Sequence, residues 1–103
     1  MLTLKRKQGE AIVCHDEGDV ILELRASLNL YKNVSIEYTT RQKRRSLDVA
    51  NRLWMEEGDT VRLPGDIIVH AVTCGRTACT LSFDSPENIT VDRSEVYIRR
   101  LGG

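Results

Sequence analysis

The chain has 103 residues, the length of one compact domain, which excludes a large multidomain enzyme. Hydrophobic residues make up 41% and charged residues 29%, a balance that predicts a folded domain and not a disordered chain. Fifteen Lys and Arg residues balance fifteen Asp and Glu residues, so no overall field draws the protein to nucleic acid or membrane, and anion binding requires local patches.

The pattern at the start of the chain argues against a membrane segment or a signal peptide. The longest apolar stretches, such as residues 20–22 and 67–69, are far shorter than the roughly 20 residues that span a bilayer. Lys5, Arg6 and Lys7 follow the apolar start, the reverse of the charge order in a signal peptide. We therefore expect a cytoplasmic protein that does not bind membranes.

Short strands with polar turns are predicted along the first part of the chain. Leu2 and Leu4 alternate with Thr3 and Lys5, which is typical of a half-buried strand over residues 1–7. Further strands are predicted as a set by alternation and bounding turn residues, at 11–14, 19–25 and 33–38.

The second part of the chain is also predicted to form short strands, and it is predicted to end in a helix. Strands are predicted at 60–63, 66–72, 79–83 and 89–91, separated by turns that contain Gly or Pro. The tail from Ser94 to Leu101 predicts a short helix, with Ser94 as its N-cap.

The middle segment, residues 40–57, has two interpretations. Leu47, Ala50, Leu53 and Trp54 fall on one face of a helix, whereas the alternation over 47–49 fits a strand equally well. Both interpretations stay open from the sequence.

An internal repeat relates the two parts of the chain. In order, residues 9–12 align with 58–61, 18–22 with 65–69, 34–38 with 79–83, and 47–51 with 89–93. This order predicts a diverged duplication with halves 1–51 and 52–103.

Cysteine and histidine spacing offers no metal site. Cys14, Cys74 and Cys79 lack the short paired spacings of a zinc site, and only His15 and His70 accompany them. Neighbours in a strand point to opposite faces, so Cys14 and His15 cannot act as nucleophile and base. We expect buried thiols, no metal, no cofactor and no enzymatic activity.

Several segments carry a resemblance in their order. The opening, residues 1–10, is an apolar strand followed by basic residues and Gly9-Glu10, and residues 58–101 supply Gly58-Asp59, a Ser85-Pro86 turn and a last strand leading into a helix. In this set the chain resembles the carbon storage regulator family (CsrA/RsmA). The segment between them is extra relative to that family.

The resemblance implies a fold and a function. It implies an all-β protein of small interleaved antiparallel sheets with a short C-terminal helix, as in the family's dimer. Family members bind GGA-containing hairpin loops of mRNA or small RNA, and repress translation by covering the ribosome-binding site. Each site combines the first strand of one subunit with the last strand of the other. With the repeat, this favours one domain over 1–103 that forms a monomeric pseudo-dimer, while a homodimer stays open.

The resemblance also carries site residues over, one by one. The implied RNA-binding residues are Leu4, Lys5, Arg6, Lys7, Ser85, Pro86, Ile89, Val91, Asp92, Arg93 and Glu95. Arg6 and Arg93 would offer planar guanidinium groups to guanine or phosphate, and the lysines would neutralise phosphates. Leu4 and Val91 would pack on bases.

The second pseudo-site has lost these groups. By the repeat, Met55 stands for Arg6, Glu56 for Lys7 and Asn51 for Arg93. We therefore expect one competent RNA site. Glu87 and Asp92 replace basic residue types of the family, which predicts weaker RNA binding or a changed sequence preference.

Other features leave alternatives open. A basic cluster, Arg41, Lys43, Arg44 and Arg45, fits an accessory RNA contact or a solvated loop. Trp54 fits core or interface packing, or stacking on a base. The alternative function is a protein-binding decoy or antagonist that keeps the fold and has lost RNA affinity, and no DNA partner is expected.

Overall fold

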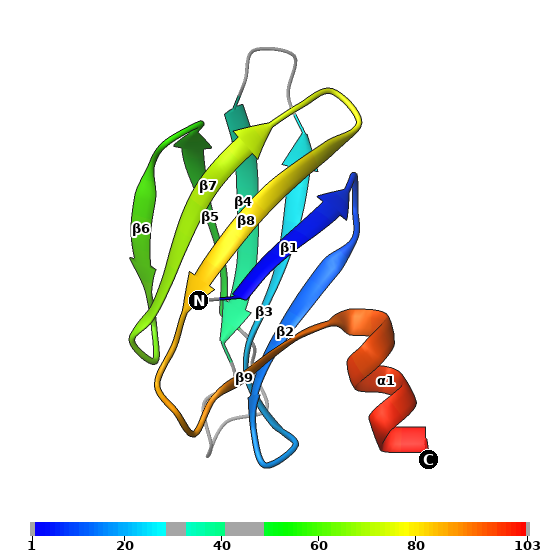
Figure 1. The fold of residues 1–103 in the computed structure, drawn as a ribbon. Coiled ribbons are helices and arrows are strands. Elements are labelled where there is room, and N and C mark those ends of the chain that lie inside the picture. Colours follow the sequence, from blue (N-terminus) through cyan, green and yellow to red (C-terminus); the bar gives the residue numbers. More distant parts are fainter. Residues whose placement is uncertain (1, 29–32, 41–48, 103) are drawn as a thin grey trace.

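A computed structural model describes residues 2–28, 33–40 and 49–102. The described residues form two antiparallel sheets and one short C-terminal helix (Figure 1), which confirms the all-β prediction. The predicted accessory contacts Arg41, Lys43, Arg44 and Arg45 lie outside the described residues. No helix within the described ranges is long and apolar enough to cross a membrane.

The strands fall into a four-stranded and a five-stranded sheet. The first sheet has the order β1 (Leu2–Lys7), β8 (Ala78–Asp84), β7 (Ile67–Cys74) and β6 (Thr60–Leu63). The second has the order β5 (Val49–Glu56), β4 (Asn33–Thr40), β3 (Asp19–Leu28), β2 (Ala11–Asp16) and β9 (Thr90–Arg93).

The two sheets exchange strands from the ends of the chain. Strand β1 pairs with β8, from Leu2↔Phe83 to Lys7↔Ala78, although some seventy residues separate the strands. Strand β9 pairs in turn with β2 near the start of the chain, from Ile12↔Arg93 to His15↔Thr90. The expected interleaving of small antiparallel sheets is therefore present within a single chain.

The strand orders carry an internal pseudosymmetry. Strand β5 of one sheet corresponds to β1 of the other, β4 to β8, β3 to β7 and β2 to β6. The order β5-β4-β3-β2 therefore matches the order β1-β8-β7-β6. The turns after β1 and β5 correspond in detail. Glu10 Oε1 accepts the amide of Lys7 at 2.7 Å, and Asp59 Oδ2 accepts that of Glu56 at 2.8 Å. Within the described part of the chain, β9 and the helix have no counterpart in this scheme.

The middle segment is a strand where the structure describes it. Strand β5 pairs with β4 from Asn33↔Glu56 to Thr40↔Val49, so the helical interpretation is wrong for residues 49–56. Residues 49–51 lie inside β5, so their alignment with the last strand of the second half is also wrong. The predicted boundary between residues 51 and 52 cuts this strand, and a boundary that keeps β5 whole lies before Val49.

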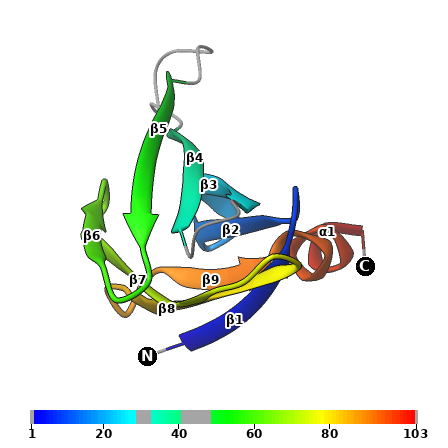
Figure 2. The same cartoon turned by 90° about the horizontal axis from the view of Figure 1, so that it is seen from above.

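The core lies between the sheets, which are seen edge-on in Figure 2. Alternating residues of both sheets fill it, and its largest fully buried side chains are Phe83, Ile12, Leu22, Leu24, Ile36, Met55, Ile67 and Leu81. The three cysteines are free and buried, as expected. Burial raises the pKa of Cys14 to about 12 and that of Cys79 to about 11, so these thiols are inert at neutral pH.

The C-terminal helix, α1 (Ser94–Gly102), covers the outer side of β2, where all five residues from Ala11 to His15 are buried. The Tyr97 ring lies 4.8 Å from the His15 ring, and the Tyr97 hydroxyl donates to the Gly18 carbonyl at 2.6 Å. Glu95 in the first turn and two arginines in the last turn match the helix dipole. The helix is thereby docked at the edge where β9 enters the second sheet.

Candidate nucleic-acid interface

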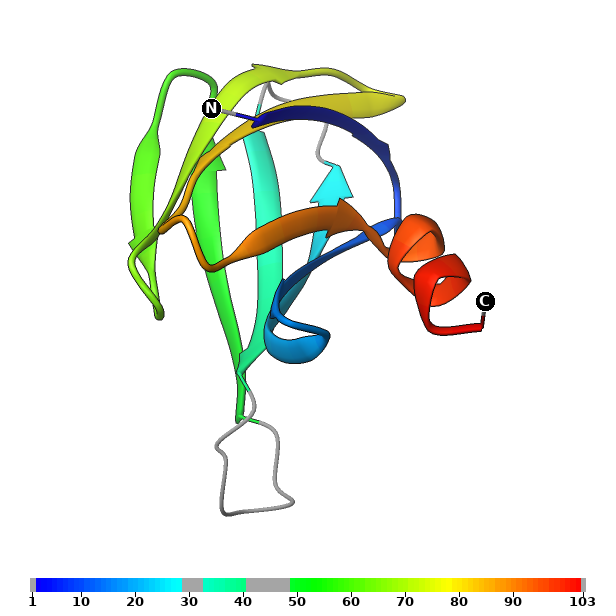
Figure 3. The same ribbon diagram turned by 60° about the horizontal axis from the view of Figure 1, so that its bottom comes forward.

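Two edge strands from opposite ends of the chain face each other at one side of the molecule. Strand β1 is at the edge of the first sheet and β9 at the edge of the second, and Figure 3 shows the two strands on the same side of the molecule. An open pocket of about 410 Å³ lies there, lined by Leu2, Phe83, Asp84, Ser85, Ile89, Thr90 and Val91. The pocket therefore combines the first strand, the end of β8 and the segment leading into β9.

A tight turn carries the chain from the first sheet to the second. The Ile89 amide donates to the Pro86 carbonyl at 3.0 Å, and the Ser85 hydroxyl donates to the Ile89 carbonyl at 3.3 Å. These bonds close the segment between β8 and β9 and bring Ser85 and Ile89 to the pocket wall. Among the predicted site residues, Ser85, Ile89 and Val91 line the pocket, and Pro86 shapes the turn beside it.

Arg6 is a structural residue in this arrangement. Its side chain is buried, and its guanidinium forms a two-bond pair with the Glu95 carboxylate at 2.8 and 3.1 Å. Further bonds go to the carbonyls of Lys5 and Ala11. The pair raises the pKa of Arg6 and lowers that of Glu95 to about 2. The prediction that Arg6 offers its guanidinium to RNA does not fit this conformation, since four of its five N–H donors are already used inside the protein and its side chain is buried.

Burial also corrects three other predicted roles. Leu4 is 8% exposed and belongs to the core, so it offers no surface for a base. Val91 is buried to the same extent, and only its edge reaches the pocket. Asp92 is buried beneath α1, where its carboxylate accepts from His15 Nε2 at 2.8 Å. Asp92 therefore holds β9 against β2 and is not a contact for a ligand.

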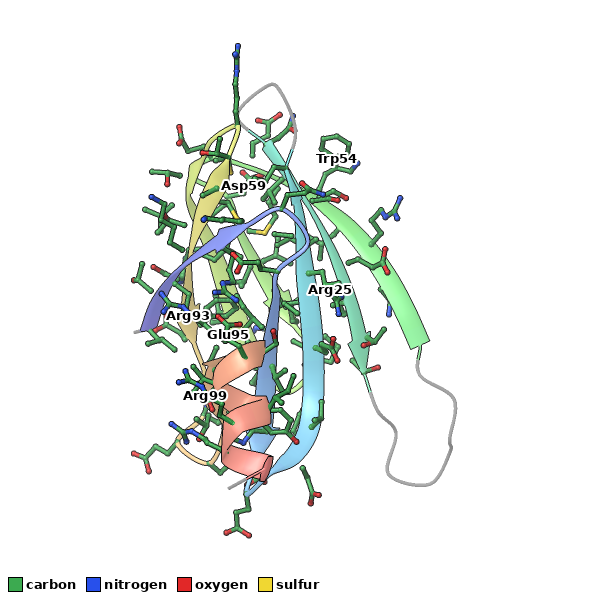
Figure 4. The ribbon with its side chains drawn as sticks, turned by 90° about the vertical axis from the view of Figure 1, so that its right-hand side faces the viewer. Arg25, Trp54, Asp59, Arg93, Glu95 and Arg99 are labelled. Carbon is green, nitrogen blue, oxygen red and sulfur yellow. The ribbon has the colours of Figure 1, made fainter. Side chains whose placement is uncertain are left out.

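Exposed cations lie on β1, β9 and α1. Arg93 is exposed and lies beside Glu95 where β9 leads into α1, with Arg99 further along the helix (Figure 4). Lys5 and Lys7 are exposed on β1, because Leu4 and Arg6 take the buried positions of that strand. Within the described part of the chain, none of these four cations forms an ion pair. This arrangement can attract an anionic ligand to the edge formed by β1, β9 and α1.

Four pocket residues were not predicted from the sequence. Leu2, Phe83, Asp84 and Thr90 reach the pocket because β1 pairs with β8 and because the turn ends at β9. Neither contact is local in the sequence, although Leu2 and Thr90 do flank predicted residues. Within the described ranges no group of His, Cys, Asp or Glu side chains could hold a metal ion.

Trp54 and the second pseudo-site differ from the first. Trp54 is 61% exposed on edge strand β5, so the prediction that it packs in the core is wrong. Packing at an interface and stacking on a base both stay predictions. Met55, the counterpart of Arg6, is fully buried, and no described strand pairs with the free edge of β6. The described residues therefore form the two-strand pocket once.

Comparisons of the chain with protein-family models, with curated proteins and with solved structures find no match. The geometry of the chain itself therefore carries the functional argument.

Proposed function

We propose that this protein is an RNA-binding post-transcriptional regulator that binds GGA-containing hairpin loops and represses translation by covering a ribosome-binding site. The observation that carries the proposal is that edge strands β1 and β9 both line one pocket, with Arg93 exposed at the end of β9. Loop bases of RNA are unstacked and can enter such a pocket, while exposed cations bind the backbone.

The strand pairing supports the same proposal. The resemblance implies that each RNA site combines a first strand with a last strand from the other subunit. Here β1 and β9 belong to the two halves of one chain, and the pseudosymmetry of the sheets supports a single-chain pseudo-dimer. A cytoplasmic protein with one RNA site per chain, without DNA or membrane partners, follows as part of the proposal.

The test is fluorescence anisotropy of a labelled RNA hairpin with GGA in its loop, beside the same hairpin without GGA. We expect loop-dependent binding that weakens about tenfold or more in Arg93→Ala, since a good guanidinium contact is worth about 1–3 kcal/mol. Arg62→Ala is the control, because Arg62 is also exposed but lies on β6, at the far edge of the first sheet.

The salt dependence separates the two roles open to Arg93. Loss of one phosphate contact reduces the slope of log affinity against log salt by about 0.7 for single strands. Loss of a guanine contact leaves this slope unchanged and reduces the preference for the GGA loop. Equal affinity of the wild-type protein for both hairpins at low salt would contradict the proposal.

The alternative is a protein-binding decoy or antagonist with a similar fold. It is favoured by one observation, the use of the Arg6 guanidinium in an internal ion pair. If the protein binds neither hairpin at low salt, the decoy becomes the better reading of the same fold.

A further inference from the structure

One acidic residue, Asp84, lines the pocket, and the proposed function leaves its role unexplained. We infer that Asp84 determines a preference for guanine at this pocket, by accepting hydrogen bonds from N1–H and the N2 amino group of the base. The inference rests on the proposed RNA-binding function and adds the residue that reads the base.

Asp84 is held in place by a chain of hydrogen bonds across the first sheet. Its Oδ2 lies 3.2 Å from Nε2 of His70 on β7, and Nδ1 of His70 lies 2.8 Å from the Thr60 hydroxyl on β6. An ionised carboxylate only accepts, so Nε2 of His70 carries a proton, and in the neutral imidazole Nδ1 accepts from the Thr60 hydroxyl. Three neighbouring strands therefore fix the orientation of this carboxylate.

The remaining acceptor capacity of Asp84 is open to a ligand. Each carboxylate oxygen can accept two hydrogen bonds, and Asp84 has one bonded partner among the described residues, His70. Its side chain is 43% exposed, so solvent or a ligand can reach it. Leu2 and Ile89 supply apolar contacts for the faces of a base in the same pocket.

Guanine fits this set of groups better than the other bases. Its Watson–Crick edge places two donors side by side, N1–H and the N2 amino group, which match the two oxygens of a carboxylate. Adenine presents an acceptor at N1, which a carboxylate repels. Single-stranded loop bases expose this edge to protein groups.

The negative charge of Asp84 would by itself lower the affinity for RNA. A carboxylate near the RNA backbone repels phosphates, so its removal raises affinity for every RNA unless the carboxylate makes a specific contact. A matched control must therefore remove the same charge nearby. Glu87→Gln does so, because Glu87 is exposed in the turn three residues after Asp84 and does not line the pocket.

The experiment compares the GGA hairpin with hairpins in which inosine, which lacks the N2 amino group, replaces each guanine in turn. For the wild type we expect about a tenfold loss at the guanine that occupies the pocket, since one acceptor is left unpaired. Asp84→Asn is expected to weaken GGA binding and abolish the difference between guanine and inosine. Glu87→Gln is expected to keep that difference.

A second variant tests the positioning of Asp84. His70→Phe removes the hydrogen bond to Oδ2 and keeps the carboxylate, so it should reduce the guanine-to-inosine difference without abolishing it. Thermal unfolding checks that each variant is folded, and Asp84→Ser replaces Asp84→Asn if the latter does not fold.

The possible outcomes distinguish a failure of the role of Asp84 from a failure of the proposed RNA-binding function. If the wild type binds the GGA hairpin and Asp84→Asn retains the full guanine-to-inosine difference, the role of Asp84 is overturned and the proposed function stands. If the wild type shows no preference for GGA, the proposed function fails and the role of Asp84 fails with it.

Discussion

Arg6 and Met55 occupy equivalent positions in the two sheets. Arg6 is paired in register with Cys79 of β8, and Met55 with Val34 of β4, the strand that corresponds to β8 under the pseudosymmetry. Both side chains are unbranched and buried. The space beneath β1 therefore accepts an apolar side chain of this length, and the charge of Arg6 serves the pair with Glu95.

This equivalence predicts that replacing Arg6 and replacing Glu95 lower the free energy of unfolding by different amounts. Arg6→Met should change the free energy of unfolding by about 1 kcal/mol or less, because Met fits the buried space and the Glu95 carboxylate left without its partner is half exposed to water. Glu95→Gln should destabilise by about 1–3 kcal/mol, because a buried guanidinium loses its carboxylate. Urea unfolding measures both, and a larger loss in Arg6→Met would contradict this account.

The exposure of Trp54 is a second prediction for a single residue. Because its side chain is 61% exposed, its fluorescence in the folded protein should be near that of the unfolded chain and readily quenched by acrylamide. Emission from the folded protein that is strongly blue-shifted and resistant to acrylamide would mean that the indole is covered, as at an interface between copies.

Single-residue burial was the hardest feature to predict from the sequence. Arginine is rarely buried, and the partner that makes burial of Arg6 tolerable lies 89 positions away, at Glu95. A lone Trp is usually packed, yet Trp54 falls on the outer face of an edge strand. Composition and periodicity carry no information on such distant partners.

The Arg6–Glu95 pair joins two elements, because it connects β1 to the first turn of α1. The helix otherwise contacts β2 through Tyr97, whose ring lies against His15, and β9 through Arg100, whose Nε lies 3.7 Å from Asp92 Oδ2. The pair thus fixes the end of β1 relative to the helix beside the candidate RNA site.

This connection predicts a dependence of stability on acid pH. The pKa of Glu95 is lowered from 4.5 to about 2, chiefly by its hydrogen bonds to Arg6. A lowered pKa contributes stability above pH 4.5, and this contribution is lost as the pH falls from 4.5 toward 2. Half of the Glu95 side chain is exposed, so solvent screening keeps the effect modest.

The measurement is the Tm of the wild type and of Glu95→Gln between pH 7 and pH 2. Other carboxylates titrate in both proteins, so the difference between the two curves reports Glu95. The difference should be largest above pH 4.5 and shrink toward pH 2, whereas a constant difference would show that the ionisation of Glu95 has no part in it.

Most elements were predictable, and the exceptions have a physical cause. Alternation predicted strands 33–38 and 79–83 within a few residues of β4 and β8, since one face of each is buried. It failed to decide residues 49–56, because helix and strand patterns coincide there. The hydrogen-bond ladder with β4 settles this segment, and the sequence of β5 does not encode that ladder locally.

In the whole molecule, each sheet receives one strand from the opposite end of the same chain. In a dimer of the kind that the resemblance implies, that strand would come from the other subunit. Strand β1 completes the sheet of β6, β7 and β8, and β9 completes that of β2 to β5. Each sheet is therefore finished within one chain. The facing of β1 and β9, which forms the candidate site, could be inferred from the sequence only through the resemblance, because it depends on pairings across nearly the whole chain.

This closure predicts a monomer with one RNA site. Light scattering should give the mass of a single chain, and a titration well above the dissociation constant should saturate at one hairpin per chain. A stable dimer with two equivalent RNA sites would contradict the pseudo-dimer and would leave the middle segment as an insertion in an ordinary homodimer.

The pairing of β1 with β8 also sets an order for biosynthesis. Leu2 is made 81 residues before Phe83, its partner in the first sheet. The hairpins from β2 to β5 can form during translation, since their partners are close in sequence. Strand β1, by contrast, remains without its partner until β8 has been made, so completion of the first sheet by β1 comes after the hairpins of the second sheet can have formed.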